Sequence, residues 1–344
     1  MRGIVCREIG TFEHVLLDEP PAPTGEEALI RVRRVGICGT DIHAFKGNQP
    51  FFTYPRILGH ELAGIVEAVG DEAAGLQDLK IKAGDQVSVI PYMACGQCVA
   101  CRKGKTNCCT QMQVLGVHID GGMRERMIVP ASHLICTNGM TLDQMALLEP
   151  FSIGAHAVRR AEIDKGDHVL VIGGGPIGLG VMALAKRQGA RVIAMEVKDS
   201  RLAFCREWAG VDATINAAAE DPQARLAELT DGEMPTVVFE ATGNAESMSE
   251  SFRWVAHGGK LVFVGLVKAD ISFHDPEFHK REMTLLASRN ATVEDFAAVI
   301  AAMQEGALDA ERYITHRVPM NALAERFEQL LQPDAGVIKA MVEL

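Results

Sequence analysis

The glycine-rich segment near the middle of the chain constrains the fold more than any other feature of the sequence. A short apolar run, residues 168–172, leads directly into a G-x-G-x-x-G pattern formed by Gly173, Gly175 and Gly178, and a helical segment follows. In that context the first glycine permits a tight turn, the second lets the backbone approach a pyrophosphate, and the third allows the helix to pack closely on the strand. The segment therefore predicts a strand, a phosphate-binding loop and the start of a helix.

Apolar runs alternate with helical segments through the second half of the chain. We expect four of these runs to be strands, namely residues 168–172, 191–195, 236–240 and 260–265. Alternation of this kind implies parallel strands joined by crossover helices. The second half is therefore predicted to be α/β, with the doubly wound parallel sheet of a Rossmann domain.

The first half has a different pattern. Short β-rich runs separated by Gly, Pro and Asp turns occupy residues 28–35, 62–69, 86–90 and 127–129. This pattern predicts an all-β, barrel-like half. The tail beyond residue 290 lacks a core of its own, so we expect it to pack back onto the first half. The chain is thus divided into residues 1–152, 153–290 and 291–344.

The composition narrows the function classes. Of the 344 residues, 48% are hydrophobic and 23% charged, which is enough for two globular domains. A formal charge of -11 and a pI near 5.5 argue against nucleic acid or an anionic membrane as the main partner, which leaves a small molecule. The charged start of the chain does not form a secretory signal, so we expect a cytoplasmic protein.

Four cysteines are close together in the first half. Cys95, Cys98 and Cys101 follow one another at a two-residue spacing, and Cys109 completes a set of four thiols that can enclose a tetrahedral zinc ion. Cysteines of a cytosolic protein are mostly reduced, so a metal site is favoured over disulfides. Four thiolates leave no place for water or substrate, so this zinc is expected to be structural. Cys108 competes with Cys109 as the fourth ligand.

A second set of metal ligands is spread along the same half. Cys38 lies well upstream of the pair His60 and Glu61, and Glu149 stands near the end of this half. Each residue alone is more typical of a core or a solvated turn, but together they hold zinc and leave one position open. A zinc with an open position lowers the pKa of an alcohol and favours loss of hydride, so these residues predict a catalytic zinc.

Two residues that follow Cys38 are suited to proton transfer. The Thr40 hydroxyl can take the substrate proton and pass it to the His43 imidazole and then to solvent. The alternative is a turn in which Thr40 only caps a helix.

The acidic residue Glu196 ends the strand that follows the glycine loop. A carboxylate at this distance hydrogen-bonds the ribose 2′-hydroxyl of NAD and repels the 2′-phosphate of NADP, so NAD is the expected cofactor. Arg201 is expected to lie against the adenine, with a plain surface charge as the alternative. The remaining residues expected to contact the cofactor are Pro176, Ile177, Gly265 and Arg289.

These motifs resemble, in order and across the whole chain, those of the zinc-containing medium-chain dehydrogenases. The resemblance implies a GroES-like catalytic domain and a Rossmann domain, with the C-terminal tail returning to the first. It implies that the second ligand set holds the catalytic zinc, with Glu61 or Glu149 alternating with water. It also favours Cys109 over Cys108 in the four-cysteine lobe, and a homodimer or homotetramer with two zinc ions per chain.

Within that family, residues 47–52, 116–118, 275–280 and 288–292 look most like bacterial hexonate 5-dehydrogenases, which oxidise L-galactonate or L-gulonate. Such a substrate needs donors for its hydroxyls and a cation for its carboxylate. The candidate substrate contacts are Asn48, Gln49, Arg56, His118 and Arg289. The alternative substrates are a free polyol such as sorbitol or the amino acid threonine. An alternative of another class is a binding protein without activity that keeps only the structural zinc.

Overall fold

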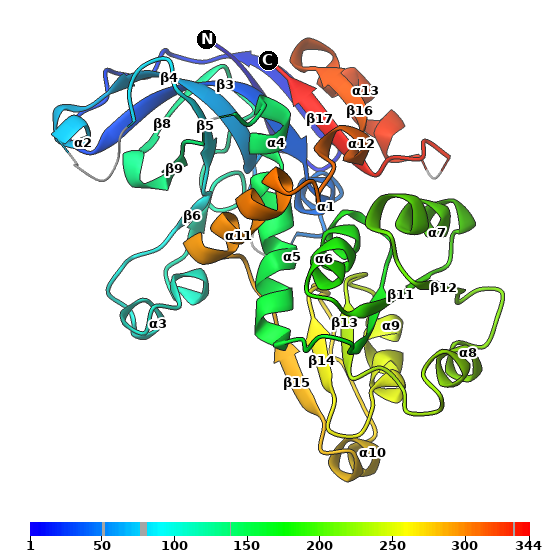
Figure 1. Ribbon diagram of the computed structural model, residues 1–344. Coiled ribbons are helices and arrows are strands. Elements are labelled where there is room, and N and C mark those ends of the chain that lie inside the picture. The colour runs from blue at the N-terminus through cyan, green and yellow to red at the C-terminus, as the bar shows by residue number, and fades with distance from the viewer. Residues whose placement is uncertain (50–51, 76–80, 138, 333) are drawn as a thin grey trace. The chain divides into compact units, whose positions relative to one another are not determined.

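The computed structural model of the chain (Figure 1) describes residues 1–49, 52–75, 81–137, 139–332 and 334–344. They form two compact units: unit 1 consists of Met1–Glu149 and Ala310–Leu344, and unit 2 of Pro150–Asp309. No helix within these ranges is long and apolar enough to cross a membrane.

Unit 1 is built on a seven-stranded sheet. The strand order is β16 (Ile314–Pro319), β17 (Lys339–Glu343), β3 (Glu27–Ile37), β4 (Glu61–Val69), β5 (Gln86–Val89) and β9 (Leu134–Ile135), with β8 (Arg126–Pro130) also paired to β3. Two small sheets join β1 (Arg2–Glu8) to β2 (Thr11–Leu16) and β6 (Tyr92–Met93) to β7 (Gln113–Val114). The predicted β-rich first half is therefore confirmed.

The central strand β3 alternates buried and more exposed residues along much of its length, as a strand with one face on a core does. Its buried Ile30 packs with Leu62 and Val342 from other strands of the sheet. The pairing also fixes the register near the end of β3. Gly36 lies opposite Glu61 of β4, and Ile37 lies opposite Ala340 of β17.

Short helices complete unit 1. They are α1 (Gly39–Phe45), α2 (Asp71–Gly75), α3 (Val99–Arg102), α4 (Leu142–Ala146), α12 (Ala310–Tyr313) and α13 (Leu323–Leu330). The C-terminal strands β16 and β17 thus belong to the same sheet as the first half of the chain, because β17 pairs with β3.

Unit 2 contains a six-stranded parallel sheet. Its order is β12 (Ala213–Asn216), β11 (Arg191–Glu196), β10 (His168–Ile172), β13 (Val237–Glu240), β14 (Lys260–Phe263) and β15 (Thr284–Ala287). The order reverses beside β10, as in a Rossmann domain, and this confirms the predicted fold. The helices of this unit are α6 (Pro176–Arg187), α7 (Asp199–Phe204), α8 (Pro222–Leu229), α9 (Ala245–Glu250), α10 (Asp275–Lys280) and α11 (Val293–Gln304), with most of α5 (Leu148–Ala161).

The units differ from the division expected from the sequence in residues 150–152 and 291–309, which lie in unit 2. A buried carboxylate explains the second difference. Asp295 of α11, whose side chain is 1% exposed, lies 2.8 Å from His156 Nδ1 and accepts a 2.7 Å hydrogen bond from Arg159 Nε, both on α5. This contact holds α11 within unit 2, and the returning segment begins at Ala310.

This contact generates a prediction about stability. Burial alone would raise the pKa of Asp295, but hydrogen bonds from His156 and Arg159 hold it well below its ordinary value. A depressed pKa means that the carboxylate stabilises the fold at neutral pH and loses this effect as the pH falls below about 3.9, the unfolded value. Asp295→Asn should lower the free energy of unfolding by about 2–4 kcal/mol at pH 7, and by less at pH 3.

Chemical denaturation of both proteins at the two pH values measures the effect. Glu294→Gln, which changes the exposed neighbouring acid, is the matched control and should be nearly neutral. Equal stability of the two variants at pH 7 would show that Asp295 does not hold α11 in this unit.

Candidate active site and metal centres

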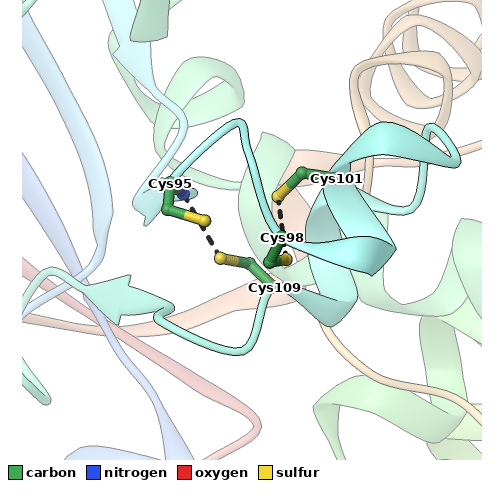
Figure 2. A group of neighbouring side chains, drawn as sticks. All are labelled: Cys95, Cys98, Cys101 and Cys109. Carbon is green, nitrogen blue, oxygen red and sulfur yellow. Dashed lines mark hydrogen bonds between the residues drawn. The ribbon is translucent and has the colours of Figure 1, made fainter.

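The four predicted lobe cysteines come together in unit 1 (Figure 2). The sulfur atoms of Cys95, Cys98, Cys101 and Cys109 all lie within 4.8 Å of one another. Cys98 precedes α3 and Cys101 lies within it, so one short helix presents two of the thiols. Cys108 is exposed and is not part of the group. The structure therefore places Cys109, and not Cys108, with the other three.

Backbone N–H groups point at these sulfur atoms. Cys109 Sγ accepts hydrogen bonds from the N–H of Cys95 at 3.2 Å and of Gln111 at 3.3 Å. Backbone N–H groups of Cys101 and Thr110 lower the pKa of the Cys98 thiol to about 5. Such donors stabilise thiolates, which are the form that binds zinc. The donor set therefore fits a closed four-thiolate zinc site.

Three residues of the second ligand set also come together in unit 1. Ligand atoms of Cys38, His60 and Glu61 all lie within 4.8 Å of one another. Cys38 is the N-cap of α1 at the end of β3, while Glu61 begins β4. The antiparallel pairing of these strands therefore brings a thiol and a carboxylate, distant in sequence, to the same end of the sheet.

Asp41 ties the two ligand segments together. Its fully buried carboxylate accepts hydrogen bonds from the N–H of Cys38 at 2.9 Å and of Gly59 at 3.3 Å, and it lies 3.8 Å from His60 Nδ1. The sequence analysis assigned no role to Asp41. The signal was its place three residues after the N-cap, where a carboxylate closes a capping box.

The fourth predicted ligand, Glu149, lies in the first turn of α5 and is buried, but it is not one of the three grouped residues. The Tyr92 hydroxyl donates a short hydrogen bond to Glu149 Oε1. Burial raises the pKa of Glu149 to about 7, although His60 opposes that rise. Nothing in the sequence around Tyr92 indicated this contact.

Lys339 of β17 is a second residue that sequence reasoning missed. Its ammonium lies 2.7 Å from Oε1 and 2.8 Å from Oε2 of Glu61, and both side chains are 1% exposed. The signal was a lone charged residue within the apolar run of the last strand. Tyr313 of α12 is also fully buried, and the charges of Glu61 and Cys38 contribute to raising its pKa above the ordinary value, after burial itself.

The charges of this buried cluster fit a divalent cation. Three buried carboxylates, those of Asp41, Glu61 and Glu149, are accompanied by the single buried ammonium of Lys339. Burial would lower the pKa of His60, but the nearby Cys38 sulfur and Asp41 carboxylate raise it well above its usual range. The raised pKa values of His60 and Glu149 mean that this cluster favours added positive charge, which a zinc ion held by Cys38, His60 and Glu61 would supply in place of protons.

The other unit 1 candidates occupy separate positions. Thr40 is half-buried and His43 exposed, and their spacing of three places them on one face of α1. Asn48 is exposed and Gln49 half-buried after that helix; Pro50 and Phe51 of the same motif lie outside the described residues.

Two further residues that we expected to contact the substrate, Arg56 and His118, form hydrogen bonds with other residues of unit 1. Arg56 bonds to Asp120 Oδ1 at 3.4 Å and to Thr53 Oγ1 at 2.9 Å. His118 Nδ1 accepts a 3.0 Å hydrogen bond from the N–H of Val114, so Nδ1 is the unprotonated nitrogen in the neutral ring.

The glycine loop in unit 2 has the predicted geometry. Gly173 adopts φ +103°, a conformation that favours glycine, immediately after β10. A Cβ at Gly178 would lie 1.9 Å from the Gly173 carbonyl oxygen, so only glycine allows this approach of α6 to the strand. Gly175 is the N-cap of α6, with Pro176 and then Ile177 in its first turn. The helix N-terminus therefore follows the loop directly, as phosphate binding requires.

Glu196 joins the end of β11 to this loop. Its Oε2 accepts a 3.0 Å hydrogen bond from the N–H of Gly174, and its Oε1 accepts one from Val197 at 2.7 Å. Arg201 lies 3.7 Å from the same carboxylate, so the structure pairs it with Glu196. Gly265 and the exposed Arg289 follow β14 and β15, and the carboxyl ends of parallel strands lie at one edge of a sheet.

Comparisons with known proteins identify the family. A family model described as zinc-binding dehydrogenase matches residues 176–305, and one described as alcohol dehydrogenase GroES-like domain matches residues 24–138. An L-galactonate-5-dehydrogenase of Escherichia coli (strain K12) is 46% identical over 327 residues, covering 94% of each chain. This chain belongs to the zinc-containing medium-chain dehydrogenase family.

Two further comparisons also match dehydrogenases. An L-threonine 3-dehydrogenase of Bacillus velezensis is 30% identical and covers 98% of each chain. The crystal structure of an alcohol dehydrogenase, RspB, from E. coli CFT073 complexed with NADH has a TM-score of 0.91 and 28% identity, covering 100% of this chain and 99% of that one. The family and the fitted donor sets together make this protein an NAD-dependent, zinc-containing alcohol or polyol dehydrogenase.

The geometry of the four-cysteine lobe predicts that Cys98 binds the structural zinc of the dehydrogenase and that Cys108 does not. Cys98→Ser should reduce zinc content from two ions to one per chain, because a hard oxygen replaces a soft ligand of a closed site. It should also lower thermal stability, since a structural zinc contributes folding free energy. Metal analysis and a melting curve measure both effects. Cys108→Ser is the control and should change neither; a zinc loss with Cys108→Ser instead would move the fourth ligand to Cys108.

The contacts of Glu196 generate a prediction about cofactor choice. Glu196→Ala should shift the ratio of kcat/KM for NAD over NADP by about ten- to a hundredfold toward NADP, because a charged hydrogen-bond acceptor and its repulsion of phosphate are both lost. Asp199→Ala, which removes another acidic side chain three residues later, is the matched control. A ratio unchanged in Glu196→Ala would mean that another group reads the ribose.

Proposed function

We propose that this dehydrogenase oxidises the C5 hydroxyl of a six-carbon aldonate, L-galactonate or L-gulonate, to a keto group. The products are a keto acid, NADH and a proton. The observation that carries the proposal is the 46% identity, over 94% of both chains, to a protein named for L-galactonate 5-dehydrogenation. That similarity extends over almost the whole of both chains, which supports a shared fold and a shared substrate class.

The residues of unit 1 supply the proton path in this proposal. When bound, zinc supplies Lewis acidity that lowers the pKa of the substrate hydroxyl, and NAD accepts the hydride. Cys38, His60 and a carboxylate from Glu61 or Glu149 hold the metal. The Thr40 hydroxyl takes the substrate proton and gives it to the imidazole of His43, which is exposed and exchanges protons with solvent.

The substrate contacts are part of this proposal. Arg56, which pairs with Asp120, is one candidate for the carboxylate. Asn48, Gln49 and His118 offer neutral hydrogen-bonding groups for sugar hydroxyls. Arg289 is exposed and follows the last strand of the parallel sheet, so we propose it as the carboxylate contact, with the cofactor as its alternative partner.

A second candidate function is oxidation of L-threonine. It is favoured by the L-threonine 3-dehydrogenase that is 30% identical over almost the entire chain. Threonine shares a carboxylate and a secondary alcohol with the hexonates, but its alcohol lies next to the amino-bearing carbon. A substrate panel therefore separates the two candidates.

We further propose that the protein is a cytoplasmic homodimer or homotetramer. Strand β15 supports the oligomer because it is an edge strand with three of its four residues exposed, including Leu285 at 40%. Exposed apolar edge strands tend to pair with another chain. The cysteines are all unpaired, which agrees with a reducing compartment.

The substrate proposal predicts a clear order of activities. With NAD, the rate of NADH formation should be highest on L-galactonate or L-gulonate, lower on the corresponding uncharged hexitol and lowest on L-threonine. A preference for threonine or for the hexitol would refute the hexonate assignment while leaving the zinc dehydrogenase assignment in place.

Arg289→Ala tests the carboxylate contact. Loss of a charge-assisted hydrogen bond costs about 1.5–3 kcal/mol, so kcat/KM on the hexonate should fall roughly tenfold to a hundredfold, and much less on the hexitol. Arg253→Ala removes another exposed arginine of unit 2, one that pairs with Glu250, and should leave both substrates unaffected. Equal losses on charged and neutral substrates, with weaker NADH binding, would assign Arg289 to the cofactor.

A further inference from the structure

The carboxylate of Glu61 is held by a cation that is buried with it. The Lys339 ammonium contacts both carboxylate oxygens, at 2.7 and 2.8 Å, and donates to the carbonyl oxygen of Ile37 at 3.1 Å. These three contacts match the three N–H groups of an ammonium. Both side chains are 1% exposed, so this is a desolvated pair and not a surface ion pair.

The space that Glu61 occupies is also built into the sheet. Gly36 lies opposite Glu61 in the pairing of β3 with β4. A Cβ at Gly36 would lie 1.9 Å from Glu61 Oε2, a distance that no side chain tolerates. Glycine at this position therefore leaves room for the carboxylate, and Lys339 fixes the carboxylate there.

The two candidate carboxylate ligands are held by unequal partners. Glu61 is grouped with Cys38 and His60 and is paired with a full cation. Glu149 lies outside that group and receives a hydrogen bond from the neutral hydroxyl of Tyr92. In a desolvated site a full counter-charge attracts a carboxylate more strongly than a neutral hydroxyl does, so Glu61 is the carboxylate that the protein restrains more strongly.

We propose that Lys339 is a positioning residue that keeps Glu61 a weak and displaceable zinc ligand. A carboxylate that shares its lone pairs with an ammonium donates less to a metal, and the ammonium itself repels the cation. The restraint keeps one position at the catalytic zinc accessible to an alcohol. The inference rests on the catalytic zinc of the proposed function, but not on the identity of the substrate.

The test uses the whole enzyme with cobalt in place of the catalytic zinc and zinc retained in the four-thiolate site. In Lys339→Met, Glu61 loses the ammonium with which it is paired, and its carboxylate should then bind the metal more strongly. We expect the visible cobalt bands, recorded without substrate, to change, and release of the catalytic metal to a chelator to slow by about tenfold, because the ammonium that repels the cation is gone. Lys339→Gln, which keeps one donor for the buried carboxylate, should shift both readouts in the same direction and serves if the methionine variant does not fold.

Three further variants separate positioning from a general structural effect. Lys339→Arg keeps the charge and should keep the wild-type spectrum. Glu61→Gln combined with Lys339→Met should give the same spectrum as Glu61→Gln alone, since the carboxylate charge is then absent. Arg317→Met removes a cation from the neighbouring strand β16, which pairs with Glu343 and Asp143, and should change neither readout.

An unchanged cobalt spectrum in both neutral variants of Lys339, or faster metal release from them, would overturn the proposal. Faster release would mean that Lys339 helps to hold the metal and does not restrain its ligand. Because no substrate is present, inactivity of the wild type on hexonates would refute the proposed substrate without affecting this result.

Discussion

The concentration of buried negative charge beside His60 is the constraint on which unit 1 depends. Asp41, Glu61 and Glu149 are all nearly inaccessible to solvent, and a carboxylate in that environment destabilises the fold unless something compensates it. Backbone N–H groups compensate Asp41, a phenol compensates Glu149, and an ammonium compensates Glu61. These partners satisfy the hydrogen bonds of the carboxylates but include only one full positive charge, so a divalent cation bound by Cys38, His60 and Glu61 would stabilise the fold further.

The sheet explains how such distant residues meet. Strand β3 pairs with β4, β8 and β17, so it is the common neighbour of the segments that carry the site. At its end lie Gly36, the carbonyl of Ile37, and then Cys38. The end of this one strand therefore provides three things in succession. Gly36 leaves space for the Glu61 carboxylate, Ile37 offers a hydrogen-bond acceptor to Lys339, and Cys38 is a candidate metal ligand. The C-terminal segment pairs with this strand through β17 and thereby supplies the cation there.

The sequence alone was sufficient to predict those features of the site whose residues lie close together in the chain. The glycine loop, the four-cysteine lobe, and the Cys38 and His60 segments each carry their signal within a few residues, and a strand order like that of unit 2 follows from alternating strands and helices. Contacts such as that of Lys339 with Glu61 could not be predicted, because pairing across 278 positions depends on strand register and leaves no local pattern. The segment 291–309 was misplaced for the same reason: the partners of Asp295 lie on α5, far upstream.

The sequence separation of Lys339 and Glu61 also has a consequence for the order of events during synthesis. Glu61 leaves the ribosome 278 residues before its counter-ion, which at roughly 5–20 residues per second is a delay of roughly 15–60 s. During that interval the nascent first half already contains its thiols and carboxylates, but not the strand that completes its sheet. A metal ion that arrives early would therefore meet a Glu61 without its counter-ion, because the Lys339–Glu61 pair forms only when β17 joins the sheet, after translation of the Rossmann unit.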